Sequence, residues 1–81
     1  MSDSNFSYEI IDHIAVLSEN PNTHWKRCLR KVSWNHGIPK WDIRDWSEPD
    51  PLTGQSKMSR GITLNDAEMD VIRKLVLQGR L

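Results

Sequence analysis

Tryptophan is the residue type whose number and spacing most clearly indicate a chemical role in this sequence. Four of the six aromatic residues are tryptophan, and all four lie between positions 25 and 46. The same window is basic, because the segment from Thr23 to Arg44 carries six lysines and arginines and a single acid, Asp42. Indole rings on an open surface stack on unpaired bases, and neighbouring cations neutralise phosphates. This combination is typical of proteins that bind single-stranded nucleic acid, since a duplex hides the faces of its bases.

The same residues allow a second interpretation, in which the partner is a protein. Tryptophan and arginine are enriched in protein interfaces and dominate their binding energy. Trp34 and Trp46 would then be buried at a dimer interface, or would form a hot spot for a protein of the transcription machinery. The charge pattern by itself also fits a solvated strand face whose cations are neutralised by nearby acids.

No pattern in the sequence indicates catalysis or a bound metal. His13, His24 and His36 fall in separate segments, without a nucleophile motif and without the i, i+4 spacing of helical zinc ligands. The single cysteine, Cys28, excludes an intramolecular disulfide and a multi-cysteine zinc site, and it reads most simply as a small strand residue. We therefore expect a protein that is not an enzyme and that has no cofactor.

Length and charge balance bound the class of protein. A chain of 81 residues forms one domain, residues 1–81, whose core is barely sufficient on its own. Eleven basic and eleven acidic residues cancel, which conceals the basic window. The sequence has no apolar run of membrane-spanning length and no leader, so we expect a cytoplasmic protein. Residues 1–6 are expected to be disordered, because chain termini fray unless they are tied down.

Alternation and turn signals predict four strands and one helix. The strands are expected at 8–17, 25–34, 40–46 and 57–63, and the glycine inside the last one, Gly61, indicates a bulge or a close backbone approach. Asn65 and Glu68 form a capping box ahead of an apolar stripe, so a helix begins there and ends before Gly79. The fold class is therefore α+β, a four-stranded antiparallel sheet followed by one C-terminal helix (ββββα).

Strict alternation in the third strand assigns its residues to two faces. Trp41 and Ile43 share one face, and Trp41 is expected in the core. The opposite face carries Lys40, Asp42, Arg44 and Trp46. The predicted first strand is apolar on both faces in its second half, so we expect both faces to be covered. One helix covers only part of one sheet face, and self-association as a homodimer is the expected solution.

Short motifs in this order resemble one protein family. Val32-Ser-Trp-Asn, Asp42-Ile-Arg and Gly61-Ile-Thr-Leu, followed by a helix, are similar to the YdbC-like bacterial branch of the positive cofactor 4 family of transcriptional coactivators. The resemblance runs from about Tyr8 to Leu77. It implies a ββββα homodimer that binds single-stranded DNA with little sequence preference, in transcription regulation and in replication or repair, and hence an association with the nucleoid.

The resemblance also assigns roles to individual residues. Arg44 of Asp-Ile-Arg and Trp46 match DNA-facing positions, Lys57 and Arg60 match a basic approach to the fourth strand, and Trp34 matches an aromatic residue near the end of the second. Together with the basic window, this gives a predicted site in which tryptophans stack on bases and cations line the path of the phosphates. Its members are Lys26, Arg30, Lys31, Trp34, Lys40, Arg44, Trp46, Lys57 and Arg60. The expected partner is single-stranded DNA, with RNA as the alternative nucleic acid.

Overall fold

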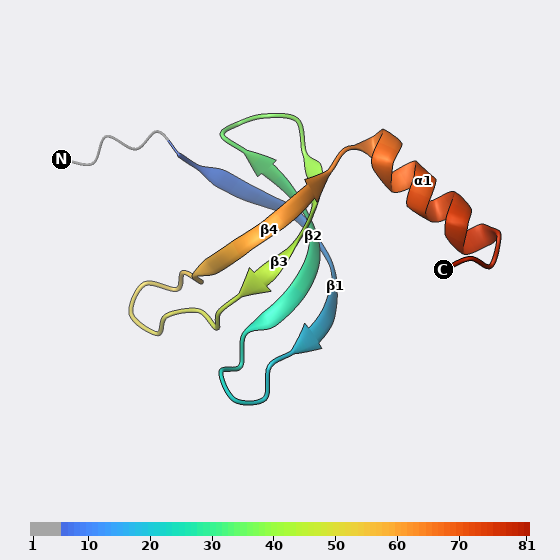
Figure 1. The fold of residues 1–81 in the computed structure, drawn as a ribbon. Helices are drawn as coiled ribbons and strands as arrows, with labels where there is room; N and C mark the ends of the chain where they lie inside the picture. Colours follow the sequence, from blue (N-terminus) through green and yellow to red (C-terminus); the bar gives the residue numbers. More distant parts are fainter. Residues whose placement is uncertain (1–5) are drawn as a thin grey trace.

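The structure, a computed structural model, describes residues 6–81 and confirms the predicted fold class (Figure 1). Four strands form one antiparallel sheet in which each strand pairs with the next along the chain, and a single helix follows. Each predicted strand lies within two residues of an observed one. The elements are β1 (Tyr8–Glu19), β2 (Lys26–Trp34), β3 (Lys40–Trp46), β4 (Met58–Leu64) and α1 (Asp66–Leu77).

The register of β2 against β3 defines two faces of the sheet. One face, here called the Trp46 face, carries Lys26, Cys28, Arg30, Val32 and Trp34 of β2 and Lys40, Asp42, Arg44 and Trp46 of β3. The opposite face, the Trp41 face, carries Arg27, Leu29, Lys31 and Ser33 of β2 and Trp41, Ile43 and Asp45 of β3. The buried apolar residues Cys28, Val32 and Trp46 all lie on the Trp46 face, so the core of the single chain is there.

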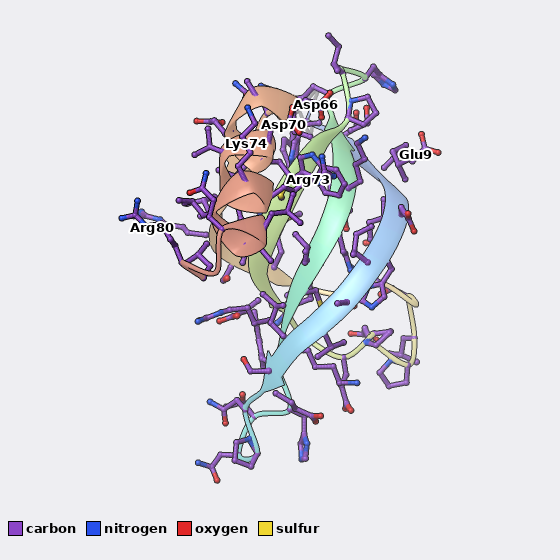
Figure 2. All side chains as sticks on the ribbon, turned by 90° about the vertical axis from the view of Figure 1, so that its right-hand side faces the viewer. Glu9, Asp66, Asp70, Arg73, Lys74 and Arg80 are labelled. Carbon is purple, nitrogen blue, oxygen red and sulfur yellow. The ribbon has the colours of Figure 1, made fainter. Side chains whose placement is uncertain are left out.

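Helix α1 lies on the side of the Trp41 face. Its capping box is present as predicted, since the side chain of Asn65 accepts a hydrogen bond from the Glu68 amide and the Glu68 side chain accepts one from the Asn65 amide. Figure 2 shows Arg80 pointing away from the sheet, while Arg73 reaches the ring of Trp41 at 5.2 Å. No residue of the helix is buried, so its apolar stripe is only partly covered by the sheet.

The single chain is flat and extended for its length. Its radius of gyration is 14.7 Å, against about 12 Å for a compact domain of 81 residues. The helix projects from one end of β4 to the side of the sheet rather than closing over it (Figure 1). Within residues 6–81 no helix is long and apolar enough to cross a membrane.

Strand β1 is an edge strand, and coverage of both its faces in a homodimer stays a prediction. Its register against β2 slips three times, and each slip leaves one extra residue on β1, at Ile11, Ile14 and Leu17. Each such β-bulge shifts by one residue the alternation of side chains between the two faces of the sheet. This shift explains why apolar residues occur at neighbouring positions of β1. These three residues are 42 to 52% exposed, so the described part of the chain covers them only in part.

The sequence predicts disorder for residues 1–6. Of these the structure describes only Phe6, because residues 1–5 lie outside the described part of the chain. The ring of Phe6 lies 5.9 Å from that of Trp34 and 6.2 Å from that of Tyr8. Phe6 therefore belongs to an aromatic cluster at the start of β1.

Candidate nucleic-acid interface

Trp46 lies in the core of the Trp46 face and does not offer an exposed ring. Trp46 is only 2% exposed to solvent. The Arg30 guanidinium carbon lies 4.7 Å from its ring centroid, and the ring of Tyr8 lies 5.6 Å away. Arg30 is held in turn by a hydrogen bond from its Nε to Nδ1 of His13, at 2.9 Å. Arg30 and Tyr8 pack against Trp46, so in the single chain its ring is buried and differs from the open platform that the sequence predicted.

Trp34 forms a second guanidinium–indole stack on the same face. The guanidinium carbon of Arg44 lies 4.5 Å from the Trp34 ring, and Tyr8 contacts the ring at 5.6 Å. Trp34 is half-buried, so part of the residue is open to solvent. The structure thus brings together Trp34, Trp46, Arg30 and Arg44, as predicted, but as two stacked pairs rather than as bare rings.

Asp42 is the residue of this face that sequence reasoning left without a role. It is 0% exposed, and its carboxylate accepts two hydrogen bonds from Arg44 Nε, at 2.9 and 2.8 Å. Arg44 Nη2 lies 2.7 Å from Asp42 Oδ1. The sequence contained the pattern that predicts this ion pair, because an acid and an arginine two residues apart in a strand lie on the same face of the sheet. The predicted site therefore contains a buried ion pair.

Gly61 on β4 provides the space for this ion pair. It lies opposite Arg44 in the register of β3 against β4. A Cβ at this position would collide with the carbonyl oxygen of Ile43 and with Cβ of Arg44. The predicted close backbone approach at Gly61 is confirmed, and its consequence is that the Arg44 side chain can lie across β4.

Two hydrogen-bond donors on this face have no partner. Nε1 of Trp34 and Nε1 of Trp46 are buried and make no hydrogen bond within residues 6–81. A buried donor without a partner is unfavourable by about 1–3 kcal/mol. Both indole N–H groups therefore carry this cost within residues 6–81.

The cations of the predicted site differ in whether a carboxylate already neutralises them. In the described part of the chain, ion pairs join Arg27 to Asp45 and Arg44 to Asp42, and none involves the other cations of the predicted site. Lys26 and Lys40 lie on the Trp46 face, and Lys26 lines a hollow of about 480 Å³ together with Arg30 and Trp46. Unpaired cations around the two stacks are free to neutralise phosphates.

Three predicted cations lie elsewhere. Lys31 is on the Trp41 face, where its Nζ lies 4.8 Å from the Trp41 ring, so it does not share a face with Arg30; the sequence alone left the facing of these two residues open. Arg60 is exposed at a register shift of β4, and Lys57 is exposed in the residue before that strand. Their neighbours Met58 and Gly61 are the β4 residues that lie opposite Trp46 and Arg44.

The remaining tryptophans are not part of the candidate site. Trp41 lies on the opposite face, half-buried rather than in the core as predicted, and its Nε1 donates to Oδ1 of Asp66 in the helix at 3.3 Å. Trp25 precedes β2 and lines a hollow with the loop 47–57, next to Glu48 and Asp50. The acids of this loop stand at the end of the sheet where Lys57 lies.

An ion pair on the Trp41 face shifts the pKa values of its two members. The Arg27 guanidinium donates to Asp45 from Nε at 2.8 Å and from Nη2 at 3.2 Å on the Trp41 face. These hydrogen bonds lower the pKa of Asp45 and raise that of Arg27. Among residues 6–81 no cluster of three histidine, cysteine or acidic side chains has the arrangement of a metal site. Cys28 is buried, as expected of a strand residue.

Comparison with known proteins identifies a relative of this chain. No model of a known protein family matches the chain. The chain is 41% identical over 71 residues to a protein of Treponema pallidum (strain Nichols) described as uncharacterized, and the alignment covers 88% of this chain and 76% of that protein. The chain therefore belongs to the same family as the Treponema protein.

Proposed function

We propose that this protein binds single-stranded DNA on the Trp46 face with little sequence preference. The observation that carries the proposal is the pair of guanidinium–indole stacks, Arg30 on Trp46 and Arg44 on Trp34, on the side of the sheet away from the helix. Unpaired bases stack on aromatic rings and on arginine guanidinium planes, and such contacts tolerate any base. A strand laid across this face would therefore find stacking surfaces and cations together.

In this proposal the residues of the face divide into two groups. The half-buried Trp34 and the two guanidinium groups receive bases, while Trp46 supports Arg30 from below. Lys26 and Lys40, together with Lys57 and Arg60 at the border of the face, pair with phosphates.

The proposed active form is a homodimer. The Trp41 face and the helix expose large apolar side chains, among them Ile62 and Val71 at 58% each and Leu77 at 86%. Exposed apolar surface of this extent marks interaction sites. A second copy packed through helix and Trp41 face would cover it and leave the Trp46 face free for DNA. The extended shape of the single chain supports this arrangement.

A protein with these properties would act wherever single strands are exposed. Transcription regulation of the coactivator type is the proposed process, with replication or repair as related settings. The corresponding location is the cytoplasm, in association with the nucleoid. No catalytic step is part of the proposal.

A direct test is the binding of a fluorescein-labelled oligo-dT, measured by fluorescence anisotropy at several salt concentrations. If the four cations assigned to phosphates each neutralise one phosphate, log K falls with log salt at a slope of about −2.8. The same experiment with a blunt duplex of equal length is the control, and it should give weaker binding because its base faces are hidden.

Two results would contradict the proposal. Absence of any anisotropy change at low salt would exclude nucleic-acid binding. A salt-insensitive interaction with a protein of the transcription machinery through the same face would instead identify the Trp46 face as a protein hot spot.

A further inference from the structure

We infer that Arg44 contacts single-stranded DNA as a charge-compensated stacking surface rather than as a partner of a phosphate, and that Asp42 is the positioning residue that keeps it so. The inference rests on the proposed function and assigns a role to a residue, Asp42, that the predicted site did not contain. It also divides the predicted cations into those that contribute to the salt dependence of binding and one that does not.

The N–H donors of Arg44 are largely occupied by partners within the sheet. A guanidinium has five N–H donors in a rigid plane. Nε and Nη2 of Arg44 face the carboxylate of Asp42, and Nη1 faces the carbonyl oxygen of Ser59 at 3.3 Å and Sδ of Met58 at 3.7 Å. These partners come from β3 and β4 and fix the plane against Trp34. A phosphate would have to displace them.

The carboxylate of Asp42 is buried, and this burial holds Arg44 in place. Asp42 is 0% exposed, and the Arg44 side chain is 14% exposed. If Arg44 turned outward to a phosphate, Asp42 would be left as a buried charge without its cation, which is strongly unfavourable. Lys26 and Lys40 carry no such constraint, because neither forms an ion pair within residues 6–81. Phosphates will therefore pair with the lysines.

Arg44 still offers the plane of its guanidinium to a ligand. Its guanidinium plane is held at 4.5 Å from the Trp34 ring, on the sheet face that the helix leaves open. A preorganised plane of this kind loses little conformational freedom when a base stacks on it. Because the charge is balanced by Asp42, the contact releases no counterion, and the salt dependence of binding does not include it.

The test compares salt slopes for oligo-dT binding in the wild type and two variants. The double variant Asp42→Asn/Arg44→Gln removes both charges together and leaves no buried carboxylate unpaired. We expect it to keep the wild-type slope while its affinity falls about 5- to 150-fold, the range for loss of one stacked base. Lys40→Gln is the matched control for a phosphate partner, and its slope should be shallower by about 0.7.

A slope of the double variant that is shallower by the same amount as that of Lys40→Gln would overturn the inference and leave the proposed function intact. Absence of oligo-dT binding by the wild type would overturn both. Far-UV circular dichroism shows whether the double variant is folded. If it is not, Asp42→Asn alone decides: freeing the charge of Arg44 should steepen the slope by about 0.7, and an unchanged slope would show that Arg44 already pairs with a phosphate.

Discussion

Replacement of Trp46 by alanine distinguishes two possible roles of this residue, a buried core residue and an exposed platform on which bases stack. Burying a tryptophan removes about 150–250 Å² from water, and at about 25 cal/mol per Å² this corresponds to about 4–6 kcal/mol as an upper estimate. Large-to-small substitutions of buried aromatic residues destabilise proteins by about 3–5 kcal/mol. Since Trp46 is 2% exposed, we expect Trp46→Ala to lower the free energy of unfolding by about 3–5 kcal/mol.

The assay is urea unfolding followed by far-UV circular dichroism at one fixed protomer concentration. Trp46→Phe is the matched control, because it keeps most of the ring volume and removes an Nε1 that makes no hydrogen bond within residues 6–81. We expect Trp46→Phe to cost less than about 1.5 kcal/mol. The reasoning would be refuted if Trp46→Ala unfolded within about 1 kcal/mol of the wild type yet bound oligo-dT more weakly, since Trp46 would then be an exposed base platform.

Three further predictions follow from the packing, the pKa shifts and the exposed apolar surface. Gly61→Ala should destabilise the sheet by about 1–3 kcal/mol in urea unfolding, because the new Cβ collides with Arg44 and the backbone of β3; wild-type stability would contradict the close approach. The lowered pKa of Asp45 means that its pairing with Arg27 stabilises the fold above the ordinary value of 3.8 and that this contribution is lost as pH falls through the lowered pKa. The stability difference between the wild type and Asp45→Asn should therefore shrink on acidification, and a difference that grows would show the opposite linkage. Ile62→Asp, on the exposed Trp41 face, should convert the proposed dimer to a monomer in size-exclusion chromatography with light scattering, whereas an unchanged dimer would place the interface elsewhere.

Local sequence signals were enough to predict the elements and the two faces of β3. The strict alternation of 40–46 assigned Asp42, Arg44 and Trp46 to one face, and the register against β2 confirms it. The capping box at Asn65 and Glu68 is present as expected. These features depend on neighbours within four residues, which is why they could be read from the sequence.

The exposure of the site residues could not be predicted in the same way. Trp46 is covered by Arg30 from β2 and by Tyr8 from β1, and no local pattern links these strands. The facing of Lys31 required the register of β2, and the three bulges of β1 break the alternation on which a prediction from sequence relies. The position of the Arg44 side chain likewise depends on the space left by Gly61 on another strand.

The most direct test of the central claim observes the four indole N–H groups by NMR during titration with oligo-dT. The Nε1 groups of Trp34 and Trp46 make no hydrogen bond within residues 6–81 and belong to the proposed DNA face, while Nε1 of Trp41 donates to Asp66 on the opposite face. We predict that the Trp34 and Trp46 indole signals shift as oligo-dT is added and that the Trp41 signal stays in place. Shifts confined to Trp41, or no shift at a saturating concentration of oligo-dT, would contradict the assignment of the Trp46 face as the site of single-stranded DNA binding.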